Sequence, residues 1–175
     1  HNGGTPEQPI DFPDLEAFGQ NNFIKELDDL ESVIDWISNS KLYKNEVDSS
    51  KITLIGHSRG GGIVTIKASE DDRVHKVISW AGVSDYAARF PTGEILELWK
   101  KHGISYIENS RTKQQLPHYY QFYENFVANK DRLHIKSAAE NLKIPHLIIH
   151  GTEDETVTLP ESKNIHLLVI IFNFI

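Results

Sequence analysis

Hydrophobic and polar positions follow one another in patterns that predict a mixed α/β domain. Over residues 23–38 apolar side chains recur at helical spacing between Asp and Glu, which predicts an amphipathic helix with an acidic start that suits the helix dipole. Short apolar, β-branched runs at 51–56, 74–80 and 147–150 predict buried strands. The glycine-rich start of residues 59–69 opens a predicted helix between the first two strands. Because strands separated by helices pair in parallel, we expect a doubly wound parallel α/β sheet with helices on both faces.

The remaining segments set the expected domain limits. Residues 1–22 are rich in Gly, Pro, Asn and Asp and predict an extended or looping segment. The stretch between the second and third strands is too long for a structureless loop, so we expect a helical cap insertion at about 86–141, over one edge of the sheet. Its aromatic residues either line a substrate pocket or form the insertion's own small core. They are Trp99, Tyr106, Tyr119, Tyr120, Phe122, Tyr123 and Phe126. We expect one domain over 1–175, with its core at 23–85 and 142–175.

Composition narrows the class of protein. The chain has 175 residues, of which 39% are hydrophobic and 25% charged, and this balance argues against disordered and fibrous proteins. Its 18 Lys+Arg and 25 Asp+Glu give a formal charge of −7, which argues against a nucleic-acid surface because phosphate binding needs clustered cations. No apolar run is long enough to span a bilayer. The absence of Cys excludes disulfides, thiolate metal sites and cysteine nucleophiles, and it fits a cytoplasmic location.

The run LIGHSRGGG, at the end of the first predicted strand, contains the pattern G-x-S-x-G as Gly56-His57-Ser58-Arg59-Gly60. This pattern is typical of a sharp strand-to-helix turn, in which flanking glycines let the chain pack tightly around a strained serine whose hydroxyl stands exposed. The amide of Arg59, at the start of the next helix, is placed to stabilise an oxyanion that forms there. Ser58 is therefore the candidate nucleophile, and it needs a histidine base and an orienting acid.

The same glycines allow a second interpretation. Gly56, Gly60 and Gly62 also fit a dinucleotide-binding pattern of NAD(P)-dependent short-chain dehydrogenases. That class predicts a catalytic Tyr with a Lys four residues later, and none of the six tyrosines has one. The pattern also lies far into the chain for such an enzyme. The dehydrogenase remains a remote alternative.

The run IPHLIIHGTEDETV supplies a candidate acid. An apolar strand ends in His150-Gly151 and is followed by an acidic turn that contains Asp154. In a doubly wound sheet, functional groups gather at the carboxyl ends of the strands, which is where Asp154 falls. Glu153 and Glu155 flank it, so a solvated acidic loop is the competing interpretation.

The order of Ser58 and then Asp154, with the phrases GHSRGGG and HGTEDETV, resembles the dienelactone-hydrolase and prolyl-oligopeptidase-like branch of the α/β-hydrolase superfamily. The resemblance implies that Ser58 is the nucleophile, Asp154 the acid and the amide of Arg59 one oxyanion donor. It implies a helical cap over the active site. It also implies hydrolysis of a small-molecule ester, thioester or amide through an acyl-enzyme, without a cofactor.

Two departures from the family pattern concern the ends of the chain. The family's histidine follows the acid after one more helix and strand, but His166 alone follows Asp154 here, in a stretch that resembles the helix directly after the acid turn. We therefore interpret His166 as a helix-face residue and expect the base and the C-terminal strand to lie outside this chain. The family's first strands also have no counterpart before His1, and the chain has no Met. We expect a fragment or processed product, and the alternative function is a catalytically disabled fragment.

The other histidines predict no metal site. His57 precedes the nucleophile, where bulky residues are tolerated, and we interpret it as structural. His146 and His150 lie four apart on a strand, a spacing that spans about 13 Å and is too wide for one metal ion. The Ser84-Asp85 pair either borders the pocket or caps the first helix of the insertion. The sequence does not indicate an oligomeric state.

Overall fold

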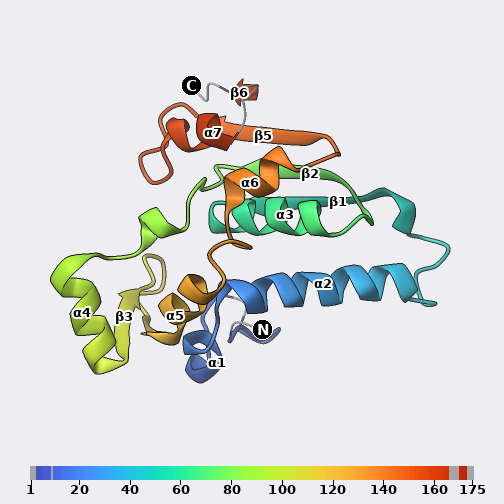
Figure 1. The fold of residues 1–175 in the computed structure, drawn as a ribbon. Coiled ribbons are helices and arrows are strands. Elements are labelled where there is room, and N and C mark those ends of the chain that lie inside the picture. The colour runs from blue at the N-terminus through green and yellow to red at the C-terminus, as the bar shows by residue number, and fades with distance from the viewer. Residues whose placement is uncertain (1–2, 9, 166–169, 173–175) are drawn as a thin grey trace. The chain divides into compact units, whose positions relative to one another are not determined.

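The computed structural model describes residues 3–8, 10–165 and 170–172, which form two compact units (Figure 1). The first unit contains the described residues up to Asp29 together with Arg89–Lys130. The second contains Leu30–Ala88 and the described residues from Asp131 onward. Most of the expected insertion therefore packs with the N-terminal segment, whereas its last part belongs to the second unit. Its role as a cap stays a prediction.

The second unit is built on a parallel sheet in the order β1–β2–β5–β6. Its strands are β1 (Ile52–His57), β2 (Val74–Trp80), β5 (His146–Gly151) and β6 (Ile170–Phe172). Its helices are the later turns of α2 (Phe23–Asn39), then α3 (Arg59–Glu70), α6 (Ile135–Glu140) and α7 (Leu159–Ile165), with 3₁₀ turns at Ser49–Lys51 and Ala87–Arg89. The parallel α/β fold is confirmed, and β1, β2, β5, α2 and α3 coincide with the predicted strands and helices.

Helices α3, α6 and α7 pack on one face of this sheet (Figure 1). Ser79 of β2 lies against Gly61 of α3, and His150, on the same face of β5, contacts Ser162 of α7. On the opposite face, Ile55 of β1 keeps 66% of its surface exposed. Along the sheet each new strand is added beside the previous one on the same side, in the order β1, β2, β5, β6. Because the crossover between parallel strands is right-handed, successive crossovers in one direction place their helices on the same face of the sheet. The sequence led us to expect helices on both faces, but within the described part of the second unit these three share one face.

The core of the second unit lies between this face and its helices. Because the strands alternate, Leu54 and Val77 point to the same side and meet Val64 of α3 and Ile34 of α2. The buried members of this cluster are Ile34, Leu54, Val64, Ala68, Val74 and Val77. Burying a residue of this kind contributes about 1.5–3 kcal/mol relative to leaving it exposed. The core thus fixes strand β1 against α3, the two elements that flank the candidate nucleophile.

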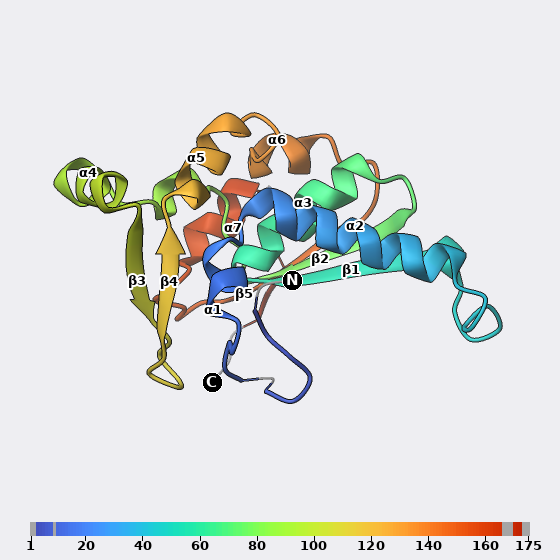
Figure 2. The ribbon, with the colours of Figure 1, turned by 90° about the horizontal axis from the view of Figure 1, so that it is seen from below.

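The first unit combines short helices with an antiparallel hairpin (Figure 2). Its elements are α1 (Leu15–Gly19), the start of α2, α4 (Gly93–His102), β3 (Ile104–Glu108), β4 (Gln115–Tyr119) and α5 (Gln121–Ala128). Aromatic residues form its interior: the ring centroids of Phe23 and Phe122 are 4.7 Å apart, and those of Phe90 and Phe126 are 4.9 Å apart. Trp99 is 4% exposed. For these residues the structure supports a core of their own, while Tyr106 is exposed.

Three local predictions were wrong. Residues 1–22 contain a helix, α1, because the Asp14 carboxylate accepts a hydrogen bond from the amide of Ala17 and caps its start. The expected insertion contains the β3–β4 hairpin as well as helices, since Ile104 pairs with Tyr119 across the two strands. We expected the C-terminal strand to lie outside this chain, but Ile170–Phe172 form β6, which pairs in parallel with β5. Short β-branched runs fit a pleated sheet even without a polar alternation.

Among the described residues, no helix combines the length and the apolar character that a bilayer crossing requires.

Candidate active site

Ser58 occupies a sharp turn between β1 and α3. Its backbone has φ 54° and ψ −120°, a conformation that a residue with a side chain rarely adopts and that costs about 1–3 kcal/mol. Hydrogen bonds hold it there: the amide of Ser58 donates to the carbonyl of Trp80 at 2.9 Å, and the Ser58 carbonyl accepts from the amides of Gly61 at 3.0 Å and Val83 at 3.3 Å. The strained backbone at a sharp strand-to-helix turn is the geometry that the sequence predicted, and the serine itself is half-buried.

Close packing around this turn depends on only some of its glycines. A β-carbon at Gly56 would lie 2.1 Å from the carbonyl oxygen of Gly60, and one at Gly61 would lie 2.7 Å from the α-carbon of Gly82. A β-carbon at Gly60 would meet nothing within 4 Å. The prediction that both glycines flanking Ser58 allow tight packing therefore holds for Gly56 and was wrong for Gly60. The reason is that Gly60 lies on the outer side of the first turn of α3.

Tyr86 supports the first turn of α3 from beneath. Its side chain is 1% exposed, and its hydroxyl donates a hydrogen bond of 2.9 Å to the carbonyl oxygen of Arg59. The same hydroxyl occupies the space beside Gly62, where a β-carbon would lie 2.4 Å away. Gly62 thus admits the tyrosine that anchors the residue after Ser58.

The loop after β2 carries a second strained residue. Ala81 has φ 46° and is 4% exposed, and its amide donates to the carbonyl of Ile149 at 2.8 Å. Farther along, the amide and the hydroxyl of Ser84 both donate to the Glu161 carboxylate of α7, at 2.8 and 2.5 Å. Asp85 accepts a hydrogen bond of 2.8 Å from the amide of Ala87, the first residue of the 3₁₀ turn that follows. The N-cap of α4, the first α-helix of the insertion, is Thr92, so the Ser84-Asp85 pair does not cap that helix, and Ser84 anchors the loop to α7.

Asp154 lies in the turn between β5 and α7. One carboxylate oxygen, Oδ1, accepts hydrogen bonds from the amides of Thr156 and Val157, both at 2.9 Å. The pKa of Asp154 is held below its ordinary value, mainly by the hydrogen bond from the amide of Val157. Burial opposes this lowering with a smaller effect, and the Thr156 amide and the nearby His150 and His57 rings add to it. The side chain is half-buried, and Glu153 and Glu155 beside it are exposed. Asp154 is thus the acidic residue of this turn that the backbone fixes.

The sheet places Ser58 and Asp154 at the same edge. His57, Trp80 and Ile149 pair in register across β1, β2 and β5, and both candidates follow the carboxyl ends of these strands. Neighbouring strands are about 4.8 Å apart, so β1 and β5 lie roughly 10 Å from each other. This separation leaves room between the two candidate residues for the imidazole of a third residue.

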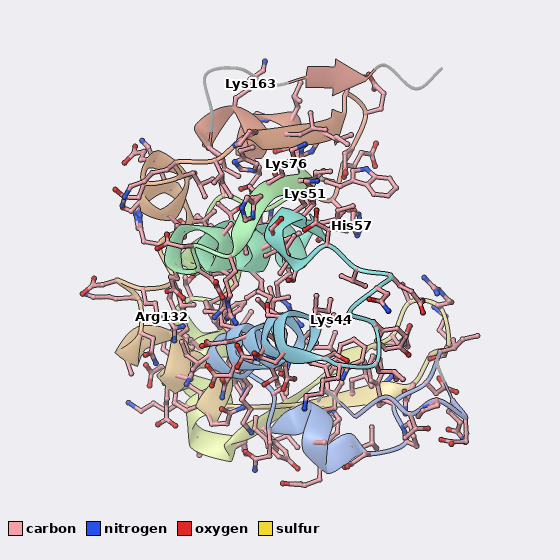
Figure 3. The ribbon with its side chains drawn as sticks, turned by 90° about the vertical axis from the view of Figure 1, so that its right-hand side faces the viewer. Lys44, Lys51, His57, Lys76, Arg132 and Lys163 are labelled. Carbon is pink, nitrogen blue, oxygen red and sulfur yellow. The ribbon has the colours of Figure 1, made fainter. Side chains whose placement is uncertain are left out.

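The histidines near this edge have other contacts. The ring of His57 lies on the face of the sheet away from α3 (Figure 3). It packs edge-to-face against Trp80, with ring centroids 5.4 Å apart. The Nε2 atom of His146 lies 2.9 Å from the Ser79 hydroxyl. His166 lies outside the described residues, so its expected place on a helix face is not tested. Within the described ranges, no group of three His, Cys, Asp or Glu residues could hold a metal ion.

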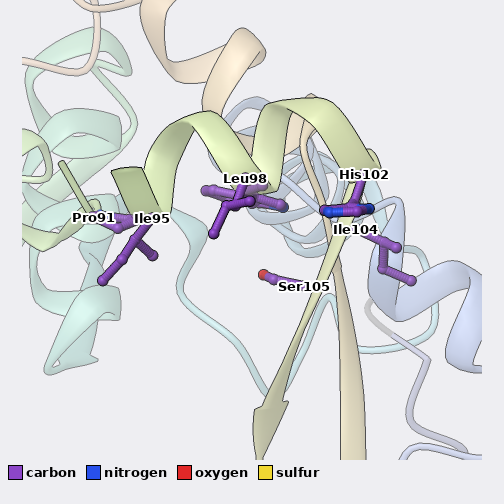
Figure 4. Close-up of a pocket in the computed structure, with 7 residues that line it drawn as sticks. Pro91, Ile95, Leu98, His102, Ile104 and Ser105 are labelled. Atoms are coloured by element: carbon purple, nitrogen blue, oxygen red, sulfur yellow. The ribbon is translucent and has the colours of Figure 1, made fainter. Parts of the chain in front are cut away.

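A shallow apolar pocket of about 200 Å³ lies within the first unit, beneath α4 and beside β3 (Figure 4). Its lining residues are Pro91, Ile95, Leu98, Trp99, His102, Ile104 and Ser105. Ile95 and Leu98 are exposed there, at 67% and 46%. Neither Ser58 nor Asp154 lines this pocket, because both candidate catalytic residues belong to the second unit.

Comparison with known proteins identifies the family. The sequence profile described as the prolyl oligopeptidase family matches residues 1–167. This chain belongs to the prolyl oligopeptidase family. Membership confirms the α/β-hydrolase and prolyl-oligopeptidase parts of the resemblance and gives no support to the dehydrogenase alternative. None of the curated proteins compared with the chain matches it.

Solved structures share the fold of this family member. A monoacylglycerol lipase of Paleococcus ferrophilus is 17% identical, with a TM-score of 0.63 over 89% of this chain and 66% of the lipase. Est1E of Butyrivibrio proteoclasticus is 19% identical, with a TM-score of 0.60 over 87% of this chain and 61% of Est1E. An acylaminoacyl peptidase of Pyrococcus horikoshii is 19% identical, with a TM-score of 0.62 over 95% of this chain and 25% of the peptidase. The chain spans less than two thirds of each of these proteins.

Sequence reasoning missed the residues that hold the site loops. Tyr86, Glu161 and Ser162 act through contacts with residues distant in sequence, and His150 was weighed only as a metal ligand. A histidine in the last buried position of an apolar strand was the one available signal, because such a residue needs hydrogen-bond partners.

Proposed function

We propose that this chain carries the nucleophile and the acid of a serine hydrolase. The observation that carries the proposal is the strained backbone of Ser58, held at the carboxyl edge of a parallel sheet by the carbonyl of Trp80 and the amide of Val83. Backbone strain of this size persists only where surrounding contacts enforce it, and it is concentrated at functional sites. The membership of the chain in the prolyl oligopeptidase family supports the same assignment.

In the proposed reaction the Ser58 oxygen attacks the carbonyl carbon of an ester, thioester or amide. A histidine accepts the hydroxyl proton and later delivers it to the leaving group. The negative oxygen of the tetrahedral intermediate accepts a hydrogen bond from the amide of Arg59, since amides in the first turn of a helix point toward its N-terminal end. Loss of the leaving group gives an acyl-enzyme, which water hydrolyses with the histidine again acting as base.

Asp154 is the proposed partner of that histidine. Its lowered pKa keeps the carboxylate ionised at neutral pH, the form that orients an imidazole and stabilises the imidazolium. Because Oδ1 already accepts two backbone amides, Oδ2 is the oxygen that we assign to the histidine. The identity of the base is part of the test, with His166 as the first residue to examine.

The proposed substrate is a small molecule with an ester, thioester or amide bond, hydrolysed without a cofactor. Esterase, lipase and peptidase structures all share this fold, and these activities use the same acyl-enzyme chemistry. We also propose a cytoplasmic location, from the absence of cysteine.

Covalent labelling with a fluorophosphonate, read by intact mass, tests the nucleophile. With His166 as the base, we expect one phosphonyl adduct on the parent chain and none on Ser58→Ala. Ser49→Ala is the matched control, since Ser49 is exposed on a 3₁₀ turn and should label as the parent does. Asp154→Asn should slow labelling, and His166→Ala then asks whether that residue is the base.

The contrary outcomes are equally specific. Absence of an adduct on a parent chain that is folded by circular dichroism would overturn the proposal and favour the catalytically disabled fragment. An adduct that persists in Ser58→Ala would place the reactive serine elsewhere.

A further inference from the structure

His150 is a fully enclosed polar residue near the candidate site. It ends the buried part of β5, and its side chain is 0% exposed. Its Nε2 atom lies 2.5 Å from the carbonyl oxygen of Val157, and its Nδ1 atom lies 2.5 Å from the hydroxyl of Ser162, which is itself 0% exposed. Both ring nitrogens are therefore engaged, and the ring cannot also reach a substrate or take the proton of Ser58.

The contact with Val157 assigns the proton on the ring. A carbonyl oxygen can only accept a hydrogen bond, so Nε2 carries a proton and donates it. In the neutral ring, Nδ1 then accepts from the Ser162 hydroxyl.

Val157 links this histidine to the candidate acid. It is 3% exposed, its carbonyl accepts from His150, and its amide donates to Oδ1 of Asp154 at 2.9 Å. Two rigid contacts on one residue fix the orientation of both of its peptide groups. A rotation of the Val157 peptides would break the bond to His150 and the bond to Asp154 together. An apolar side chain could fill the volume of His150, but it could not hold the Val157 carbonyl.

We propose that His150 is a positioning residue for Asp154: it clamps the carbonyl of Val157 through Nε2–H, and the amide of Val157 thereby holds the carboxylate at the edge of the sheet where Ser58 lies. The significance of this clamp for catalysis rests on the proposed function, in which Asp154 is the acid. The clamp itself is a property of the folded chain.

Three variants and one control separate this role from plain packing. His150→Gln keeps a donor that can reach the Val157 carbonyl, whereas His150→Leu removes it. Ser162→Ala removes the partner of Nδ1 alone. His146→Gln is the matched control on the same strand, since its ring contacts Ser79 and not the acid turn.

The readout is the carboxyl carbon resonance of Asp154 as a function of pH, in chain labelled with ¹³C-aspartate and assigned with Asp154→Asn. We expect a depressed pKa for Asp154 in the parent, His146→Gln and His150→Gln chains. In His150→Leu we expect it to rise toward the ordinary value of about 3.9. Ser162→Ala should give an intermediate shift. A folded His150→Leu chain whose Asp154 pKa equals that of the parent would refute the clamp.

A second measurement does not depend on any variant remaining folded. Two-bond ¹H–¹⁵N correlations of the parent report which ring nitrogen of His150 is protonated, with the ring assigned from its carbon shifts in the parent chain. We expect protonated Nε2 and unprotonated Nδ1, and the reverse would overturn the proposal. Neither measurement uses Ser58, so failed labelling of Ser58 would remove the catalytic role of Asp154 and leave the clamp standing.

Discussion

The two glycines that flank Ser58 have opposite surroundings, so the same substitution should have opposite effects at the two positions. A β-carbon at Gly56 would lie 2.1 Å from the Gly60 carbonyl oxygen, 2.5 Å from its carbonyl carbon and 2.8 Å from Cγ2 of Val64. A β-carbon at Gly60 would meet nothing within 4 Å. Both residues belong to the same five-residue motif, so each serves as the control for the other.

The expected magnitudes follow from which atoms would have to move. At Gly56 the nearest two atoms belong to the backbone of α3, which cannot rotate away, and the turn that holds Ser58 must shift by about 1 Å. Overpacking costs about 1–3 kcal/mol where neighbours can adjust, so we expect Gly56→Ala to cost about 3 kcal/mol or more. For a chain of this size that lowers Tm by roughly 6–12 °C. Gly60→Ala places a better helix former at an open helical position and should stabilise by about 0.5 kcal/mol, or roughly 1–2 °C.

Thermal unfolding followed by far-UV circular dichroism measures both effects, and fluorophosphonate labelling of Ser58 reports on the turn itself. We expect Gly56→Ala to lose labelling and Gly60→Ala to retain it. Equal Tm values for the two variants, or a larger loss in Gly60→Ala, would refute the argument that packing against α3 requires glycine at position 56.

Three further predictions concern the contacts that support the fold. Tyr86→Phe removes the 2.9 Å hydrogen bond to the Arg59 carbonyl and should lower the free energy of unfolding, measured in urea, by about 1 kcal/mol. It should also slow the labelling of Ser58. Unchanged stability and labelling would contradict the anchoring role of Tyr86. Lys67 is 2% exposed and pairs with Glu31 at 2.9 Å. Glu31→Gln should lower the free energy of unfolding by about 1–2 kcal/mol and Lys67→Met by less, because only Glu31→Gln leaves a buried charge poorly paired. A larger loss in Lys67→Met than in Glu31→Gln would contradict this account. The Arg73 guanidinium donates hydrogen bonds to both carboxylate oxygens of Asp71 and holds the pKa of that carboxyl below its ordinary value. The stability that this ion pair contributes is therefore present above about pH 3.9 and is lost as the pH falls through the folded-state pKa of Asp71. Asp71→Asn should therefore be less stable than the parent at pH 7, by about 1 kcal/mol, and the difference should shrink in urea titrations at pH 3; a difference that does not depend on pH would exclude the ion pair as its cause.

Several elements were predicted correctly from local pattern because their neighbours in sequence are also their determinants. The helix α2 follows from apolar residues at a spacing of three and four, and β1, β2 and β5 follow from short β-branched runs. The strained turn at Ser58 follows from glycine beside serine between a strand and a helix. Helix α1 and strand β6 were missed because a capping contact or a partner strand decides them, and neither leaves a strong periodic signal.

The candidate site divides in the same way. The residue types of Ser58 and Asp154, and their place after two apolar strands, were legible along the chain. The strand order β1–β2–β5 decided that both lie at one edge of one sheet, and the direction of that order placed α3, α6 and α7 on a single face. The contacts that hold the site join residues far apart in sequence: Ser84 with Glu161, Tyr86 with Arg59, and His150 with Ser162.

The sequence by itself determined the helices α2 and α3, the strands β1, β2 and β5, the family and the two candidate catalytic residues of this protein. Only the tertiary structure decided which glycine is sterically required and which histidine is committed to the acid turn. The physical reason is that periodicity and turn chemistry act over a few residues, whereas close packing and buried hydrogen bonds depend on atoms that folding brings together from distant segments.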